Sequence, residues 1–229
     1  MKAIILAGGE GTRLKPLTNN VPKPMVQVLG RPILEHILEA LPKEITELLI
    51  VVGYKAEVIR DHFGFQYQDR KISYIQQDQR LGTAHALGLC RRYFSPNERF
   101  LYMVADDLHL AKALSNLLQH ERGILVSKHA EPSRFGVVEV TEDNIVRGIE
   151  EKPEQPRSNL VSTGVYVLDT QIFNYPARLE VNGEYYITSQ VEKMLKDYPL
   201  TAVQTDFWHP IGYPEDIALA EDLLQKRYG

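Results

Sequence analysis

The sequence is poor in cysteine: Cys90 is the only one among its 229 residues. A single cysteine excludes an intramolecular disulfide and a zinc site built from thiolates alone. Seven histidines are present, but they do not form the His-Glu-x-x-His spacing of a zinc enzyme, which argues against such a site. The scarcity of cysteine fits a reducing compartment, and we expect a cytoplasmic protein.

Long apolar runs and excess positive charge are also missing. The apolar run after Lys2 stops at Gly8, whereas a signal peptide is longer and a membrane helix needs roughly 20 apolar residues. The net charge of −4 provides no general attraction to nucleic acid or to an anionic membrane. We therefore expect a soluble protein that binds neither partner, without internal repeats and in particular without the hexapeptide repeat of a β-helix.

Short apolar runs alternate with amphipathic segments through the first 126 residues. Such runs are typical of strands buried on both faces of a sheet, and their alternation with helices predicts a mostly parallel sheet covered on both sides. The expected strands are residues 3–7, 48–52, 72–75, 100–104 and 124–126, and helices are expected to begin near Pro32, Ala56, Thr83 and Leu110.

The rhythm changes after residue 130. Strands are expected at 137–140, 145–149 and 161–168 with little helix between them, followed by helices that begin near Ile187 and Pro214. This order suggests an antiparallel extension of the same sheet. The prediction is one α/β domain over residues 1–229, Rossmann-like, with a mixed but mostly parallel sheet and helices on both faces.

A glycine-rich turn, Gly-Gly-Glu-Gly-Thr-Arg, occupies residues 8–13 directly after the first expected strand. Its backbone N–H groups can approach a phosphate closely, and Arg13 adds a fork of donors. The turn is not a Walker loop, and Leu14 stands where a dinucleotide-binding motif has its third glycine. Alone, it is equally compatible with a plain connection between strand and loop.

Several candidate site residues follow. Lys23 lies between two prolines, which predicts an extended backbone and not a helix surface. Asp106 and Asp107 follow the strand at 100–104, at the edge where ligands gather in open α/β sheets. A cation site is favoured there, although one of the two acids could cap the next helix. Cys90 is interpreted as a core residue.

An ordered series of motifs makes the interpretation of this glycine-rich turn more specific. They are GTRL at 11–14, PLT at 16–18, PKPM at 22–25, LGTA at 81–84, FGVV at 135–138, EEKP at 150–153, TGVY at 163–166 and GYPED at 212–216. With this series the sequence resembles the sugar-1-phosphate nucleotidyltransferases, the family of glucose-1-phosphate thymidylyl- and uridylyltransferases, through most of its length.

The resemblance implies a nucleotide-diphospho-sugar transferase fold, an NTP and a sugar 1-phosphate as substrates, and Mg²⁺ as cofactor. UTP or dTTP and glucose 1-phosphate are favoured, and a homo-oligomer is compatible with the family. It also assigns roles to residues of this chain: Gly8, Gly9 and Gly11 hold the nucleotide, Arg13 and Lys23 bind its phosphates, Gln77 and Gly82 receive the base, Asp106 binds Mg²⁺, Gly136, Glu151 and Asn159 face the sugar, and Lys152 binds its phosphate.

The chain departs from the family at three positions. Ala105 replaces the usual glycine before the metal-binding aspartate. Pro210 stands where the family normally has a second metal-binding aspartate, which puts the metal site in doubt. Ser189 replaces a frequent aspartate and, with Glu192, fits a capping box.

Two alternatives stay open. One is a catalytically weak module of the same fold that binds a nucleotide-sugar and regulates. The other is a different acceptor such as a choline phosphate, although Glu151 and Asn159 suit a polyhydroxylated acceptor better than a quaternary amine, for which an aromatic cage is expected.

Overall fold

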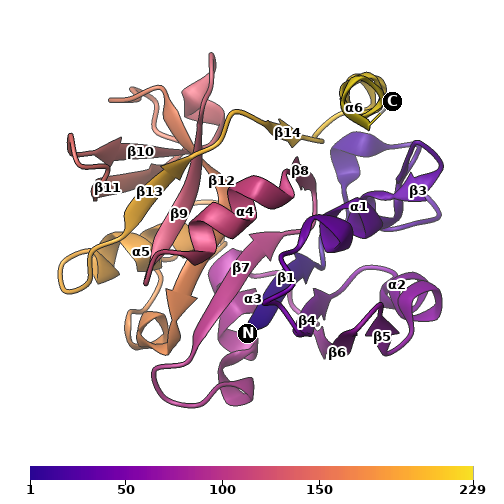
Figure 1. The fold of residues 1–229 in the computed structure, drawn as a ribbon, viewed down its shortest axis with the longest axis horizontal. Coiled ribbons are helices and arrows are strands. Elements are labelled where there is room, and N and C mark those ends of the chain that lie inside the picture. Colours follow the sequence, from indigo (N-terminus) through magenta and orange to yellow (C-terminus); the bar gives the residue numbers. More distant parts are fainter. Residues whose placement is uncertain (229) are drawn as a thin grey trace.

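Strand β1 (Lys2–Ala7) lies in the interior of a ten-stranded sheet in the computed structural model, which describes residues 1–228 (Figure 1). Along the sheet the strands follow the order β11 (Val146–Glu151), β10 (Gly136–Val140), β12 (Leu160–Asp169), β7 (Arg99–Val104), β1, β4 (Glu47–Val52), β6 (Arg70–Gln76) and β5 (Gln66–Tyr67). Off this path, β9 (Gly123–Lys128) pairs with β12 and with β13 (Thr201–Gln204).

The sheet divides into a parallel and an antiparallel part. Strands β7, β1, β4 and β6 run parallel to one another, whereas β12 is antiparallel to β7, β10 and β9. In Figure 1 the parallel strands are coloured from indigo (β1) to magenta (β7), and the antiparallel strands β9 to β12 beside them run from rose to orange. The mixed α/β sheet predicted from the sequence is therefore confirmed.

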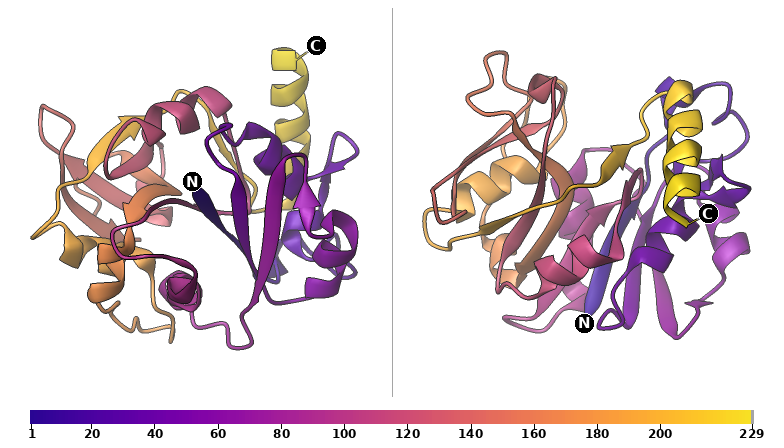
Figure 2. Two further views of the ribbon diagram at one scale, coloured as in Figure 1. Left: turned by 60° about the horizontal axis from the view of Figure 1, so that its bottom comes forward. Right: turned by 45° about the horizontal axis from the view of Figure 1, so that its top comes forward.

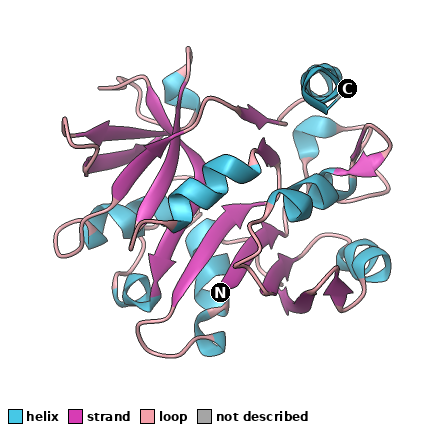
Figure 3. Ribbon diagram, in the orientation of Figure 1, coloured by secondary structure: helices cyan, strands magenta, loops and turns pink. Residues whose placement is uncertain are grey.

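Helices cover both faces of the sheet, as the views in Figures 2 and 3 show. Side chains of β1 alternate between the two resulting cores: Ile5 packs on one side and Ile4 on the other. One core contains residues of α1 (Ile33–Ala40), α2 (Ala56–Phe63), α4 (Ala111–Leu118) and α6 (Pro214–Tyr228), and the other contains residues of α3 (Thr83–Leu89) and α5 (Ile187–Met194).

Cys90 directly follows α3 and confirms its interpretation as a core residue. Its side chain is fully buried and its thiol donates to the Ala86 carbonyl oxygen at 3.6 Å. Burial raises the pKa of the Cys90 thiol to about 12 because an apolar environment disfavours the thiolate. None of the helices within residues 1–228 is long and apolar enough to cross a membrane.

Two capping predictions were wrong. Helix α5 begins after Tyr186, so Ser189 lies inside its first turn, where its hydroxyl donates to the Tyr186 carbonyl and accepts from the Arg178 N–H, each at 2.9 Å. Helix α4 is preceded by Leu110 and has no side-chain cap. Asp107 belongs to a short strand instead, which pairs with residues 208–210.

That strand is one of several small elements that the sequence did not predict. Strand β8 (Asp107–His109) pairs antiparallel with β14 (Trp208–Pro210), and β2 (Gln27–Val28) pairs with β3 (Arg31–Pro32). The first pair matters for function because it lies immediately after β7, at the edge of the sheet where Asp106 is found.

Candidate functional site

A cleft of about 360 Å³ opens at the carboxyl ends of the parallel strands. Strands β1, β6 and β7 end there at Ala7, Gln76 and Val104, and the residues after each of them line the cleft. This is the edge at which open α/β sheets bind ligands. The cleft brings together seven of the predicted residues: Gly8, Gly9, Gly11, Lys23, Gln77, Gly82 and Asp106.

The glycine turn and Lys23 are packed against each other. Gly11 has a φ of 65°, in the left-handed region that favours glycine. A Cβ atom at Gly11 would lie only 2.7 Å from the Cβ atom of Lys23, so the lysine stem occupies the space that a side chain would need. The Gly11 carbonyl accepts from the Thr18 hydroxyl at 2.8 Å. The turn therefore presents bare backbone to the cleft and also fixes the path of Lys23.

Lys23 forms an ion pair with Asp106, from which 83 residues separate it in the sequence. The distance from Lys23 Nζ to Asp106 Oδ2 is 2.8 Å. The predicted extended backbone at Lys23 was wrong, because the residue begins a short 3₁₀ turn, Lys23–Met25. The other carboxylate oxygen, Oδ1 of Asp106, is buried without a hydrogen-bond partner in the described structure. An unpaired buried carboxylate oxygen is chemically suited to a hard cation such as Mg²⁺.

Asp107 has a different environment from its neighbour. Its Oδ2 accepts from the Trp208 indole N–H at 2.8 Å, and only 8% of the residue is exposed. Burial, and then the charge of Asp106, raise the pKa of the Asp107 carboxyl well above its ordinary value. The ionised form of Asp107 is therefore less favourable than that of an exposed aspartate, and its Oδ2 is already engaged by the indole.

Pro210, which stands where the family normally has a second aspartate, lies next to these two acids. Pro210 pairs with Asp107 across the β8–β14 ladder, and the Ile211 N–H donates to the Asp106 carbonyl oxygen at 3.2 Å. His209 does not substitute for it, because its Nε2 is hydrogen-bonded to the Asp216 carbonyl oxygen at 2.8 Å. In the described part of the chain, no group of three or more histidine, cysteine, aspartate and glutamate residues could hold a metal ion.

Gln77 and Gly82 also line the cleft, and they contact each other. Gln77 Nε2 lies 3.3 Å from the Gly82 carbonyl oxygen. At Gly82 the φ is 92°, and a Cβ atom would lie 2.5 Å from the Tyr185 carbonyl oxygen. The sequence predicts that Gly82 leaves space for a base. The structure adds a second reason for a glycine at this position, because any side chain would collide with the backbone of Tyr185.

The predicted sugar residues Gly136 and Glu151 are brought together by strand register. They are partners in the β10–β11 ladder. Glu151 Oε2 accepts from the Thr188 hydroxyl at 3.0 Å, and its Oε1 lies 3.5 Å from Lys152 Nζ. The Lys152 ammonium also lies 5.3 Å from the centre of the Tyr186 ring. The sequence did not predict a site role for Thr188 or Tyr186. Both are distant in sequence from Glu151 and are brought to it by α5 and the residue before this helix.

Asn159 and Arg13 are not brought to these clusters. Val137 pairs with Val161, so the exposed Asn159 lies three residues along β10 from Gly136, about 10 Å at strand spacing. Arg13 is exposed and does not line the cleft; its guanidinium carbon lies 5.4 Å from the centre of the Tyr213 ring. The structure therefore does not place either residue beside the other predicted site residues, and their roles stay predictions.

An ion pair that the sequence did not predict connects two loops of the cleft. Arg80 Nη1 lies 2.9 Å from Glu10 Oε2, and both residues line the cavity. The signal was present in the sequence, since Arg80 stands between two predicted nucleotide-binding residues. It adds a second basic side chain to the lining of the cleft, which also includes Lys23.

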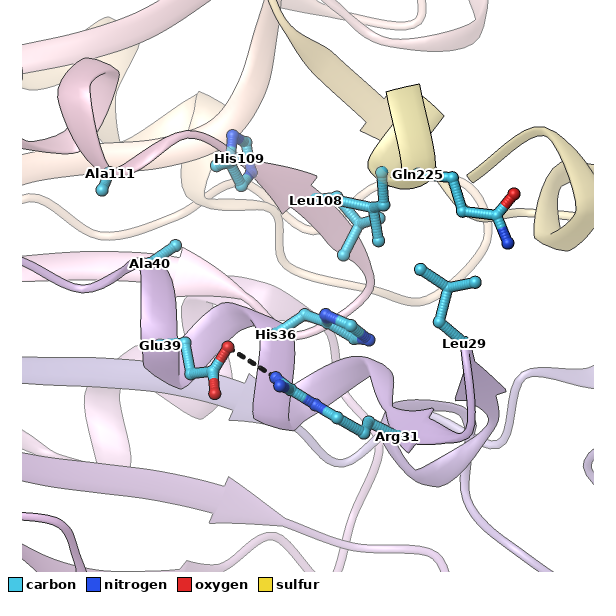
Figure 4. A pocket seen from close by; sticks show the side chains of 10 residues that line it. Leu29, Arg31, His36, Glu39, Ala40, Leu108, His109, Ala111 and Gln225 are labelled. Atoms are coloured by element: carbon cyan, nitrogen blue, oxygen red, sulfur yellow. Dashed lines mark ion pairs between the residues drawn. The ribbon is translucent and has the colours of Figure 1, made fainter. Parts of the chain in front are cut away.

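A second and larger cavity, of about 690 Å³, lies away from this cleft (Figure 4). It is lined by α1, α6 and β8, and the Arg31–Glu39 ion pair lies along one side. None of the predicted site residues lines it. His109 does: this side chain is buried, and neither ring nitrogen has a partner among the described residues. Burial lowers the pKa of His109 to about 4.

Comparison with known proteins places this fold and cleft in a class. Residues 2–227 match the family described as nucleotidyl transferase, and the chain belongs to that family. The resemblance drawn from the ordered motifs is thereby confirmed.

Individual relatives agree with this assignment. The chain is 36% identical to the UTP–glucose-1-phosphate uridylyltransferase AglF of Haloferax volcanii, covering 99% of this chain and 97% of the relative. It is 34% identical to the bifunctional protein GlmU of Methanococcus vannielii over 99% of this chain but 55% of the relative. The chain therefore spans about half the length of such GlmU relatives.

Two solved structures have the same architecture. A Bacillus anthracis protein assigned as a glucose-1-phosphate thymidylyltransferase, in complex with sucrose, has a TM-score of 0.86 at 29% identity, covering 97% of this chain and 94% of that one. A UDP-glucose pyrophosphorylase complexed with UDP-glucose has a TM-score of 0.84 at 26% identity, covering 99% and 98%. The predicted nucleotide-diphospho-sugar transferase fold is therefore confirmed.

Proposed function

We propose that the protein transfers a nucleotidyl group from an NTP to a sugar 1-phosphate, releasing pyrophosphate and forming a nucleotide-sugar. UTP or dTTP is the favoured donor and glucose 1-phosphate the favoured acceptor. The observation that carries the proposal is the single cleft in which a glycine-rich turn, Lys23 and Asp106 meet. Family membership and the names of the AglF and pyrophosphorylase relatives support it.

The chemistry needs positioning and charge stabilisation more than proton transfer. An oxygen of the sugar phosphate is already an anion, so it attacks the α-phosphorus without a general base. The bond from the α-phosphorus to the bridging oxygen of the β-phosphate breaks, and pyrophosphate leaves with that oxygen. Lys23, Arg80 and Lys152, together with backbone N–H groups of residues 8–11, provide the donors for these anions.

Mg²⁺ is the proposed cofactor, with Asp106 as its protein ligand. When bound, the ion neutralises charge on the triphosphate. Because Lys23 pairs with Asp106 Oδ2 and Pro210 provides no carboxylate, the protein alone offers a weak site, and most ligands of the ion would come from the NTP phosphates and water. Lys23 would be available to phosphate once its ion pair with Asp106 is broken.

The base assignment is supported by Gln77, whose side-chain amide is buried at the cleft wall. The acceptor assignment is supported by Glu151 and Lys152, which place a carboxylate and an ammonium together beside Gly136. A polyhydroxylated phosphate ester presents both hydroxyl donors and an anion to such a pair.

The decisive experiment is a matrix of UTP, dTTP, CTP, ATP and GTP against several sugar 1-phosphates and choline phosphate, with pyrophosphate release measured with and without Mg²⁺. Mg²⁺-dependent release with a sugar 1-phosphate supports the proposal. Tight nucleotide-sugar binding without release favours the regulatory module instead, and release only with choline phosphate favours the other acceptor class.

Replacement of Glu151 is expected to change acceptor selection. Glu151→Ala removes the carboxylate that Thr188 and Lys152 hold in place, so KM for the sugar phosphate should rise about tenfold and discrimination between sugar epimers should fall. Glu150→Ala is the matched control, because Glu150 is the preceding and exposed acid on β11. Unchanged epimer selectivity in Glu151→Ala would contradict its assignment to the sugar.

Replacement of Pro210 is expected to change the metal requirement. Pro210→Asp adds a carboxylate opposite Asp107 and near the Asp106 backbone, so the Mg²⁺ concentration for half-maximal rate should fall several-fold. Pro210→Asn is the control, because it removes the fixed φ of proline without adding a charge. It should leave the Mg²⁺ concentration for half-maximal rate unchanged. Calorimetry of Mg²⁺ with the wild-type protein alone completes the test, since tight binding there would contradict a site with a single carboxylate.

A further inference from the structure

His85 lies in the first helical turns of α3, next to the glutamine proposed to contact the base. Its Nδ1 is 3.1 Å from Gln77 Nε2. The same Gln77 nitrogen lies 3.3 Å from the Gly82 carbonyl oxygen. His85 is partly buried and is not among the residues that line the cleft, so any effect it has on a bound nucleotide acts through Gln77.

The carbonyl oxygen of Gly82 identifies which atom of the Gln77 amide faces it and His85. A carbonyl oxygen can only accept, so the amide atom that faces it must be the nitrogen and not the oxygen. Because that nitrogen is only a donor, His85 Nδ1 must accept from it, and the proton of the neutral imidazole is on Nε2. The two hydrogens of Gln77 Nε2 are thus directed at two protein acceptors.

The Gln77 side-chain oxygen is left for a ligand. Oε1 lies beside the glycine turn, since a Cβ atom at Gly8 would be 3.0 Å from it. No donor among the described residues contacts Oε1. With its nitrogen occupied, the buried Gln77 amide offers an acceptor and no donor to the cleft.

We infer that His85 is a positioning residue that sets the base selectivity of the enzyme by holding the Gln77 amide as an acceptor; this rests on the proposed function. The N3–H of uracil or thymine can donate to such an oxygen. Cytosine has an unprotonated N3, and its lone pair would face the Gln77 oxygen. An arrangement of this kind rejects the wrong base because a buried polar group is left unpaired.

The test compares His85→Leu, which has no acceptor, with His85→Asn, whose amide oxygen can take the place of Nδ1. In His85→Leu the ratio of kcat/KM for UTP to that for CTP should fall about tenfold, mainly through KM for UTP. His85→Asn should restore the ratio to within a few-fold of wild type. His120→Leu, the same substitution at another partly buried histidine, is the control, and thermal melting establishes that each variant folds.

A double-mutant cycle separates positioning from a general structural effect. In a Gln77→Ala background, His85→Leu should change the UTP-to-CTP ratio no further, because the group through which it acts is gone. An unchanged ratio in His85→Leu, or an equal drop in both backgrounds, would overturn the inference. If His85→Leu melts early, His85→Phe replaces it in the same cycle.

Calorimetric binding of UTP and CTP to the same variants keeps this result distinct from the proposed function. Binding that prefers UTP and loses that preference in His85→Leu supports the role of His85 even if no pyrophosphate is released. Normal pyrophosphate release with a His85-independent ratio would retain the function and remove the role of His85.

Discussion

Asp106→Asn should lower kcat at least a hundredfold while leaving the melting temperature close to that of wild type. The asparagine keeps the shape of the side chain and a hydrogen-bond partner for Lys23, but it loses the charge that Mg²⁺ requires. Loss of one electrostatic contribution to the transition state typically costs 10²–10³ in rate. The side chain of Asp106 is 40% exposed, so little stability depends on it.

Asp107→Asn is the matched control, one residue away. Burial disfavours the charged form of Asp107, and an asparagine oxygen can still accept from the Trp208 indole. Its turnover should stay within a few-fold of wild type, measured as pyrophosphate release at saturating substrates. The opposite pattern, with a normal Asp106→Asn and an inactive Asp107→Asn, would move the metal ligand to Asp107.

Acid should destabilise the protein through His109, and His109→Phe should remove that loss. The folded-state pKa of about 4 lies below the ordinary value of 6.5, so the unfolded chain takes up the proton first. Above pH 6.5 His109 is mostly unprotonated in both the folded and the unfolded state, so it has little effect on stability. The free energy of unfolding falls as the pH is lowered from 6.5 toward 4. At pH 4.5 the contribution is about 2.5 kcal/mol.

Urea unfolding at pH 7 and pH 4.5 measures this effect. The free energy of unfolding should decline less in His109→Phe than in wild type, by about that amount, because phenylalanine cannot take up a proton. The large cavity beside His109 has room for the ring. His120→Phe should lose stability in parallel with wild type, and parallel losses in His109→Phe as well would show that other groups cause the acid sensitivity.

The central sheet could be predicted because its strands are short apolar runs buried on both faces. Strands β1 and β4 are found within a residue of the expected ranges. The three-residue strands β8 and β14 could not be predicted, since they contain aspartate, histidine and proline and are stabilised by pairing with each other. Ser189 misled the capping prediction because sequence spacing does not distinguish an N-cap from a residue inside the first turn.

For the site, motifs identified the residues but not their partners. The contact between Lys23 and Asp106 depends on β1 and β7 lying side by side, and that between Glu151 and Thr188 depends on α5 packing against β11. Such contacts follow from topology and not from any local pattern. Asn159 fitted the motif by position, yet strand register places it away from Gly136.

The inert thiol of Cys90 makes the native sequence a ready background for fluorescence labelling. A buried thiol with a pKa of about 12 should not react with maleimides at neutral pH. Cysteines introduced at Val181 and Leu17, both exposed, would then take up dyes alone. Val181 lies on the segment whose Tyr185 backbone contacts Gly82, so energy transfer between the two dyes would measure whether the distance from that segment to Leu17 changes when substrates bind, with no native residue of the cleft altered.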